Sequence, residues 1–140
     1  MTLLKSITER VYRNGDPNDR STPLCLLTID EFFHGNDVVG SIGCNLDSTP
    51  SPSQFFELFK SISHRKDVHG VFVQITAFDT PDWPFSDTVW VITSCSEEEV
   101  QSWFPDELAP NEVWAGWIES QTYEPVDVPV GTTPIACWWD

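Results

Sequence analysis

The residues best suited to binding chemistry are the tryptophans and carboxylates in the second half of the chain. Residues 67–140 contain fourteen Asp and Glu and all seven tryptophans, but no Lys or Arg. Indole rings offer large, stiff contact surfaces, and they attract cationic groups to their faces. This combination predicts a surface that binds Lys, Arg or a quaternary ammonium group. The candidate binding residues lie in predicted loops and irregular stretches: Trp83, Trp114, Trp117, Asp82, Asp87, Glu112 and Glu119.

A second interpretation of the tryptophans is structural. Trp90 lies in the middle of a predicted strand and Trp103 on the inner side of a predicted helix, so both are expected in the core. The remaining rings, including Trp138 and Trp139 at the chain end, would then cover the edges of the core of a small domain. Their accessibility decides between the two interpretations.

Glu31 is the one weak candidate for acid–base catalysis. It lies on the same face of a predicted strand as Leu27, Ile29 and Phe33, and this face is assigned to the core. Burial there would raise the pKa of its carboxyl group, as in general acids. Two alternatives stay open. A register shift of one residue would give this place to Asp30, or the strand end would emerge into solvent.

Motifs for other chemistries are absent from the sequence. The acids Asp79, Asp82 and Asp87 lack the spacing and central glycine of a calcium loop, and roles in turns explain them. The three histidines have no metal-binding helical spacing, and neither a nucleophile elbow nor a phosphate-binding loop occurs. We therefore expect no metal, no cofactor, and a binding role rather than catalysis. Because uncompensated acids repel phosphates, nucleic acid is the least favoured partner.

Length and composition predict one globular domain over residues 1–140, with a helix and loop over 1–22 and an irregular stretch over 106–131. The start of the chain lacks the apolar core of a secretory signal, and no apolar run is long enough for a membrane span. A soluble cytoplasmic protein without a membrane partner is expected. The four cysteines form no Cys-x-x-Cys pair, and we expect mainly buried thiols.

Hydrophobic periodicity predicts the elements that must position these residues. The clearest helix begins at Ser51, because Ser51 and Gln54 form a capping box and Pro52 suits the first helical position. Ser96 and Glu99 repeat this pattern. Helices are expected over 2–13, from 52 to near 64–66 and over 96–104, with a short turn or helix around 111–118. Strands are expected over 23–33, 38–46, 68–78, 88–95 and 133–139.

The resulting order, (α)ββαββα…β, predicts an α+β fold. Strand pairs separated by helices fit an antiparallel or mixed sheet of about five strands, with two or three short helices on one face.

In size, acidity and tryptophan content the chain resembles small bacterial immunity proteins, which neutralise basic toxins. This resemblance of composition implies a non-enzymatic module that binds a basic protein partner and steers it with a negative field. Two other functions stay open. One is a small enzyme or ligand-binding domain that uses a buried Glu31 to act on a sugar or a cationic metabolite. The other is a structural or oligomeric accessory protein.

Overall fold

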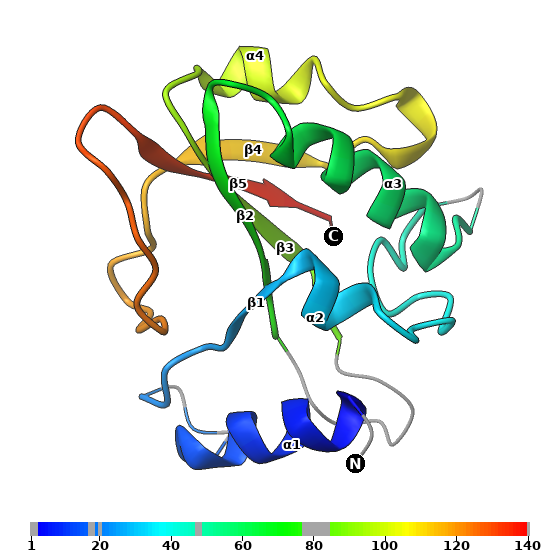
Figure 1. Cartoon of the computed structure of the whole chain (residues 1–140), viewed down its shortest axis with the longest axis vertical. Coiled ribbons are helices and arrows are strands. Elements are labelled where there is room, and N and C mark those ends of the chain that lie inside the picture. The colour runs from blue at the N-terminus through cyan, green and yellow to red at the C-terminus, as the bar shows by residue number, and fades with distance from the viewer. Residues whose placement is uncertain (1–2, 17–18, 20, 47–48, 77–84, 140) are drawn as a thin grey trace.

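A five-stranded antiparallel sheet, in the order β1-β2-β3-β5-β4, forms the centre of the molecule (Figure 1). The computed structural model describes residues 3–16, 19, 21–46, 49–76 and 85–139. The strands are β1 (Leu26–Thr28), β2 (Val68–Gln74), β3 (Thr88–Thr93), β4 (Glu112–Ala115) and β5 (Thr133–Trp138). The helices are α1 (Leu3–Arg13), α2 (Ile29–Phe33), α3 (Pro52–Ser63), α4 (Glu97–Gln101) and the 3-10 helix η1 (Asp106–Leu108). The predicted α+β fold with an antiparallel sheet is confirmed.

One face of the sheet, the helix face, is covered by α2, α3 and α4 (Figure 1). Val89 and Val91 of β3 point to this side, because alternate residues of a strand share a face. Phe55 and Phe59 lie one helical turn apart on α3, and both are completely buried. Their ring centroids lie 5.7 and 6.2 Å from that of Trp139. The helix face therefore holds the main apolar core.

The opposite face, the aromatic face, is covered by an irregular stretch that we call the crossing segment (residues 116–132). It leaves β4 at one edge of the sheet and returns to β5. Between these points it reaches the other edge, where Leu24 N donates to Thr122 O at 2.9 Å and Glu124 N donates to Leu24 O at 3.0 Å. Because β1 and β4 are the two edge strands, the chain must cross the whole sheet. Leu26, Trp90 and Ala136 are buried beneath it.

The predicted strand over residues 23–33 is wrong for most of its length. The strand β1 ends at Thr28, and α2 begins at once. A capping box explains the change: Glu31 N donates to Thr28 Oγ1 at 3.1 Å, and Thr28 N donates to Glu31 Oε1 at 2.9 Å. These reciprocal bonds satisfy two backbone donors that a continued strand would have to pair elsewhere. Local capping therefore overrides the apolar alternation.

The predicted strand over residues 38–46 is also wrong, since this stretch forms turns. A single parallel bridge joins Ile42 to Ser86. Gly43 adopts a φ of +65°, and a Cβ added there would lie 2.5 Å from Cζ of Phe55. The glycine thus serves a turn that approaches the α3 core closely, and the chain cannot continue as a regular strand.

Residues 111–118, predicted as a turn or short helix, instead contain the edge strand β4. Its register with β5 places Glu112 opposite Trp138 and Trp114 opposite Ala136. Val and Trp favour a pleated, half-buried surface, which suits this position. The correction brings Glu112 and Trp114 onto the same face of the sheet.

Two of the four cysteines are buried thiols as predicted, namely Cys25 and Cys137. Burial raises the pKa of the Cys25 thiol to about 12. Cys44 is exposed and Cys95 half-buried, and all four are free. Among the helices that the structure describes, none is long and apolar enough to cross a membrane.

Candidate functional site

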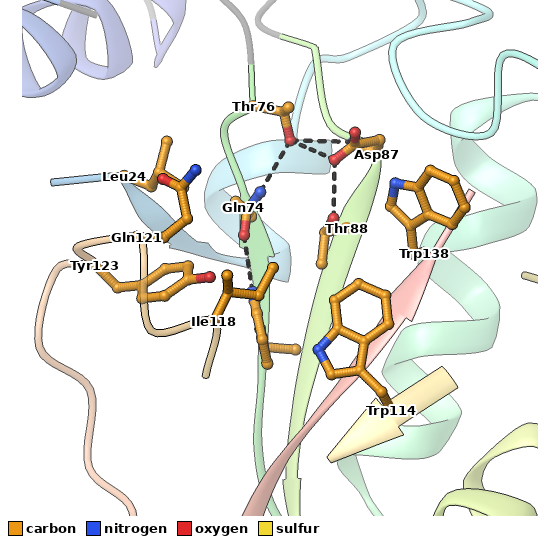
Figure 2. Close-up of a pocket in the computed structure, with 11 residues that line it drawn as sticks. Leu24, Gln74, Thr76, Asp87, Thr88, Trp114, Ile118, Gln121, Tyr123 and Trp138 are labelled. Atoms are coloured by element: carbon orange, nitrogen blue, oxygen red, sulfur yellow. Dashed lines mark hydrogen bonds between the residues drawn. The ribbon is translucent and has the colours of Figure 1, made fainter. Parts of the chain in front are cut away.

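A chain of side-chain hydrogen bonds runs along the aromatic face and ends at Asp87 (Figure 2). Trp90 Nε1 donates to Gln74 Oε1 at 2.9 Å, and Gln74 Nε2 donates to Thr76 Oγ1 at 3.1 Å. Thr76 Oγ1 then donates to Asp87 Oδ1 at 2.6 Å, and Thr88 Oγ1 donates to the same oxygen at 2.8 Å. Every donor in this polar chain is directed towards the carboxylate. Together they stabilise its negative charge.

The pairing of β2 with β3 builds this polar chain. Gln74 lies opposite Thr88, and Trp90 is two residues further along β3 on the same face. After the strands separate, Thr76 N donates to Phe85 O at 2.9 Å, which keeps the two chain segments together. The strand register therefore fixes the distance between the indole and the carboxylate.

Asp87 lines a pocket of about 250 Å³, here called the Asp87 pocket (Figure 2). Trp90, Trp114 and Trp138 come from three different strands of the sheet, and Tyr123 comes from the crossing segment. Asp87 is the only charged residue that the structure describes in the lining. The pocket thus combines aromatic walls with one fixed negative charge.

The rings around Trp90 form a packed cluster. Trp117 lies 4.5 Å from Trp90 between ring centroids, and Tyr123 lies 4.9 Å from Trp117 and 5.5 Å from Trp90. Trp114 meets Trp90 edge to face at 6.3 Å. Trp90 is completely buried, whereas the other three residues are half-buried. The cluster is therefore a rigid base with partly accessible rings at its rim.

The hydroxyl of Tyr123 is a polar atom without a partner in this cluster. Its oxygen is buried, and no hydrogen bond of normal geometry reaches it from the described residues, although the backbone of Ile118 lies near. Burial raises the pKa of this hydroxyl. In Figure 2 the hydroxyl points into the Asp87 pocket. A bound group would satisfy it only after neighbouring side chains move, because the oxygen is now inaccessible to water.

An ion pair and several hydrogen bonds fasten the crossing segment to the rest of the fold. Arg10 of α1 donates to both carboxylate oxygens of Glu124, at 2.8 and 3.2 Å, and Leu26 N and Asn14 also donate to them, both at 3.0 Å. Burial acts to raise the pKa of Glu124, but these hydrogen bonds outweigh it and hold the pKa below its ordinary value of 4.5. A second link joins His69 Nε2 to Asp127 Oδ2 at 2.9 Å. The wall that carries Tyr123 is therefore held in place electrostatically.

Glu31 belongs to this fastening. Its carboxylate caps α2 through one oxygen and accepts from Arg10 Nη1 at 2.9 Å through the other. The side chain is 39% exposed. The predicted desolvated acid on a strand is therefore wrong, because residue 31 lies on a helix and is already paired with a cation.

Comparison with known proteins gives a family. A model described as "Uncharacterized protein YfbO family" matches residues 2–137. The chain belongs to the YfbO family. A protein of Escherichia coli (strain K12) with the description "Uncharacterized protein YfbO" is 49% identical over 140 residues, which cover all of both chains. No solved structure matches the chain significantly.

In this member of the YfbO family, the sequence candidates fall into several environments. Asp87 and Trp114 line one pocket, and Glu112 lies beside that pocket's Trp138 in the sheet register. Trp117 packs into the ring cluster, and Glu119 is exposed on the crossing segment. Asp82 and Trp83 lie outside the described residues.

Several of the other acids that the structure describes lie away from the Asp87 pocket. Glu97, Glu98 and Glu99 begin α4, and Asp106 and Glu107 form most of η1, which both pack on the helix face. The acidic second half of this family member therefore spreads its charge over both sides of the sheet. Among the described acids, Asp87 has a distinct environment, since it lines a pocket together with aromatic rings.

One further group of side chains has the composition of a metal site. Ligand atoms of Asp67, Cys95 and Glu99 lie within 4.8 Å of one another. Partial burial and the hydrogen bond that Cys95 Sγ donates to Asp67 Oδ2, at 3.0 Å, raise the pKa of the thiol to about 11. Arg65 Nε lies 3.4 Å from the other Asp67 oxygen. A protonated thiol and a neighbouring cation explain the arrangement without a metal.

The sequence did not point to five residues of the site, namely Gln74, Thr76, Thr88, Tyr123 and Trp138. Trp138 was noted as a ring near the chain end but not as part of a pocket. Gln74 carried a usable signal, because an amide inside an apolar strand needs hydrogen-bond partners on its own face. Tyr123 carried none, since its place depends on the path of the crossing segment.

Proposed function

We propose that this member of the YfbO family is a non-enzymatic interaction module that binds a basic protein partner through the aromatic face. The observation that supports this most strongly is Asp87, the one charged residue among the described lining of a pocket walled by Trp114 and Trp138. A cationic side chain entering there meets both a carboxylate and the faces of indole rings. Trp and Tyr anchors of this kind carry much of the energy of protein interfaces.

The size of the pocket favours a single side chain over a whole metabolite. Its volume is about 250 Å³, below the roughly 300–1,000 Å³ typical of small-molecule sites. A pocket of this size suits the single side chain of a Lys or Arg residue, so it can serve as the anchor point of a larger interface.

The charge of the chain supports rapid encounter with a basic partner. The formal net charge is −15. Two of the basic residues are engaged in contacts within the chain, because Arg10 pairs with Glu124 and Arg65 stacks on Trp103 at 4.1 Å. A field of this sign attracts cationic proteins and falls off with added salt. Glu112 and Glu119, both exposed, extend the negative charge beyond the pocket.

The proposal is tested by capture from a lysate of the source organism followed by binding kinetics. Immobilised protein is compared with the double variant Asp87→Asn/Trp114→Ala and with the control Glu98→Gln/Trp103→Ala, which makes matching changes on the helix face. We expect a basic protein to be retained by the wild type and the control and lost by the pocket variant. The association rate of this basic protein with the wild type should fall at least about tenfold between low salt and physiological ionic strength.

Two results contradict the proposal. The first is a captured partner that both double variants release equally, since recognition would then not use the aromatic face. The second is an association rate that ionic strength leaves unchanged, because the negative field would then play no part in docking.

A ligand-binding role is the second candidate, and the unpartnered Tyr123 hydroxyl favours it. A hollow of about 400 Å³, lined by the crossing segment, shares Tyr123 with the Asp87 pocket. A small cationic metabolite that bridged the two would satisfy the hydroxyl and the carboxylate together. Saturable binding of such a compound with no protein captured from the lysate would select this function over the first.

A further inference from the structure

We infer that the Asp87 pocket is a receptor for a primary ammonium group, the head of a Lys side chain, and discriminates against the guanidinium of Arg. The inference rests on the proposed binding of a basic partner and names the group that the partner inserts. It is carried by the way the carboxylate is held, by the polar atoms around it and by the shape of the aromatic walls.

The hydrogen bonds of Asp87 leave room for one strong contact and not for two. Thr76 and Thr88 both donate to Oδ1, at 2.6 and 2.8 Å, whereas Oδ2 accepts no hydrogen bond from any residue that the structure describes. A guanidinium binds a carboxylate best as a fork, with one donor to each oxygen. An ammonium group is a compact point charge that needs a single acceptor atom. The occupied Oδ1 therefore disfavours the fork and leaves the geometry of an ammonium contact intact.

The other polar atoms of the pocket suit a group that only donates. Because the Thr88 hydroxyl gives its proton to Asp87, its buried oxygen keeps the capacity to accept a hydrogen bond. The Tyr123 oxygen is buried beside the Ile118 backbone and makes no hydrogen bond of normal geometry to a described residue, so it retains acceptor capacity at the wall of the pocket. An ammonium group carries three donors and no acceptor. The pocket thus offers oxygen atoms of the kind that such a group requires.

The walls of the pocket suit the stem of a Lys side chain. Trp114 and Trp138, both half-buried, stand on one side in Figure 2, and Ile118 and Tyr123 stand on the other. A chain of four methylenes can lie along such rings while its charged head reaches the carboxylate. The ring faces add cation–π attraction to the head group. A neutral side chain of the same length would keep the packing but lose both the attraction to the carboxylate and the cation–π attraction.

The test uses three small probes of known structure: N-acetyl-lysine methylamide, the arginine counterpart and the norleucine counterpart. Each is titrated at constant ionic strength while the indole N–H signals of Trp114 and Trp138 are followed by NMR. We expect the lysine probe to shift both signals saturably. The arginine probe should bind at least about fivefold more weakly, and the norleucine probe, which lacks the charge, at least about tenfold more weakly.

Two variants separate the pocket from general acidity. Asp87→Asn keeps an oxygen that both threonines can donate to, and it should lower the affinity for the lysine probe about tenfold and abolish the preference for lysine over arginine. Glu98→Gln on α4 removes the same charge far from the pocket and should leave the affinity within about twofold. If Asp87→Asn fails to fold, Trp138→Leu provides a second variant, with an expected loss of about fivefold.

Several outcomes overturn the inference. Tighter binding of the arginine probe contradicts the role given to Oδ1, and equal losses in Asp87→Asn and Glu98→Gln reduce the effect to net charge. If no probe shifts the two indoles while a captured basic protein still binds the aromatic face, the inference fails and the proposed function survives. If the lysine probe binds as expected but no basic protein is captured, the proposed function fails and the ammonium site stands.

Discussion

Both faces of the sheet carry aromatic residues, but the two faces differ in polarity. On the helix face, Phe55, Phe59 and Trp139 are completely or almost completely buried among apolar side chains. On the aromatic face, Trp90 is equally buried, yet its indole N–H begins a polar chain that ends at a partly exposed carboxylate. The helix face holds the main apolar core, and the polar chain of the aromatic face supports our proposal that this face serves recognition.

The covers of the two faces explain this difference. The helix α3 satisfies its own backbone and needs only an apolar stripe, which Phe55, Phe59 and Ile62 provide. The crossing segment is irregular, so much of its attachment comes from side chains such as Arg10 and from its pairing with Leu24. An irregular cover leaves space beside it, and the Asp87 pocket occupies that space.

The largest effect is expected on the helix face. Phe59→Ala removes a completely buried ring that touches Phe55, Trp139 and Phe104. It should reduce the free energy of unfolding by about 3–5 kcal/mol, because transfer and cavity terms add. Urea unfolding followed by circular dichroism measures this loss. A loss below about 1 kcal/mol would contradict the assignment of the main core to this face.

The next largest effect is expected where the crossing segment is fastened. Arg10→Met leaves the half-buried Glu124 without its cation and should reduce the free energy of unfolding by about 2–3 kcal/mol. Arg13→Met, an exposed change on the same helix, is the control and should stay within about 0.5 kcal/mol. Equal losses for the two variants in urea unfolding would contradict this prediction, because the effect would then come from net charge and not from the contact between Arg10 and Glu124.

Acid should weaken the same fastening, and the sign follows from the pKa of Glu124. Since hydrogen bonds hold its folded-state pKa below the ordinary 4.5, its contribution to stability is present above about pH 4.5 and is lost as the pH falls through the folded value. Glu124→Gln should therefore flatten the loss of stability between pH 5 and 3. Urea unfolding at a series of pH values checks this, and parallel curves for variant and wild type would contradict it.

The smallest effect on stability is expected at the pocket itself. Asp87→Asn keeps acceptors for Thr76 and Thr88 and lies at a partly exposed position, so it should cost less than about 1 kcal/mol. Urea unfolding measures the role of Asp87 in stability, and the binding titration measures its role in recognition. A loss as large as that of Phe59→Ala would mean that Asp87 serves the fold more than recognition.

The regular parts of the fold were predictable because local signals agree there with tertiary packing. The capping box at Ser51 and Gln54 and the apolar stripe of α3 both appear in the sequence and in the structure. The strand β3 likewise follows from its β-branched and aromatic residues, and β5 from its short apolar run. At Thr28 and Glu31 two signals competed, and the capping box prevailed over the alternation.

The site was predictable only in part. Asp87 and Trp114 were chosen for their residue types, and the structure brings them to one pocket. Trp138 and Tyr123 join that pocket through the register of β5 and the path of the crossing segment, and neither is written in local sequence. Residues far apart along the chain converge through such pairings, which composition and spacing do not specify.

The most direct measurement is the dissociation constant of the captured basic partner for two matched variants, Trp138→Ala on the aromatic face and Trp103→Ala on the helix face. Both remove a half-buried indole, and Trp103 is the ring on which Arg65 stacks. Trp138→Ala should weaken binding at least about tenfold and Trp103→Ala less than about twofold. Equal losses, or a larger loss for Trp103→Ala, would contradict the division of roles between the two faces.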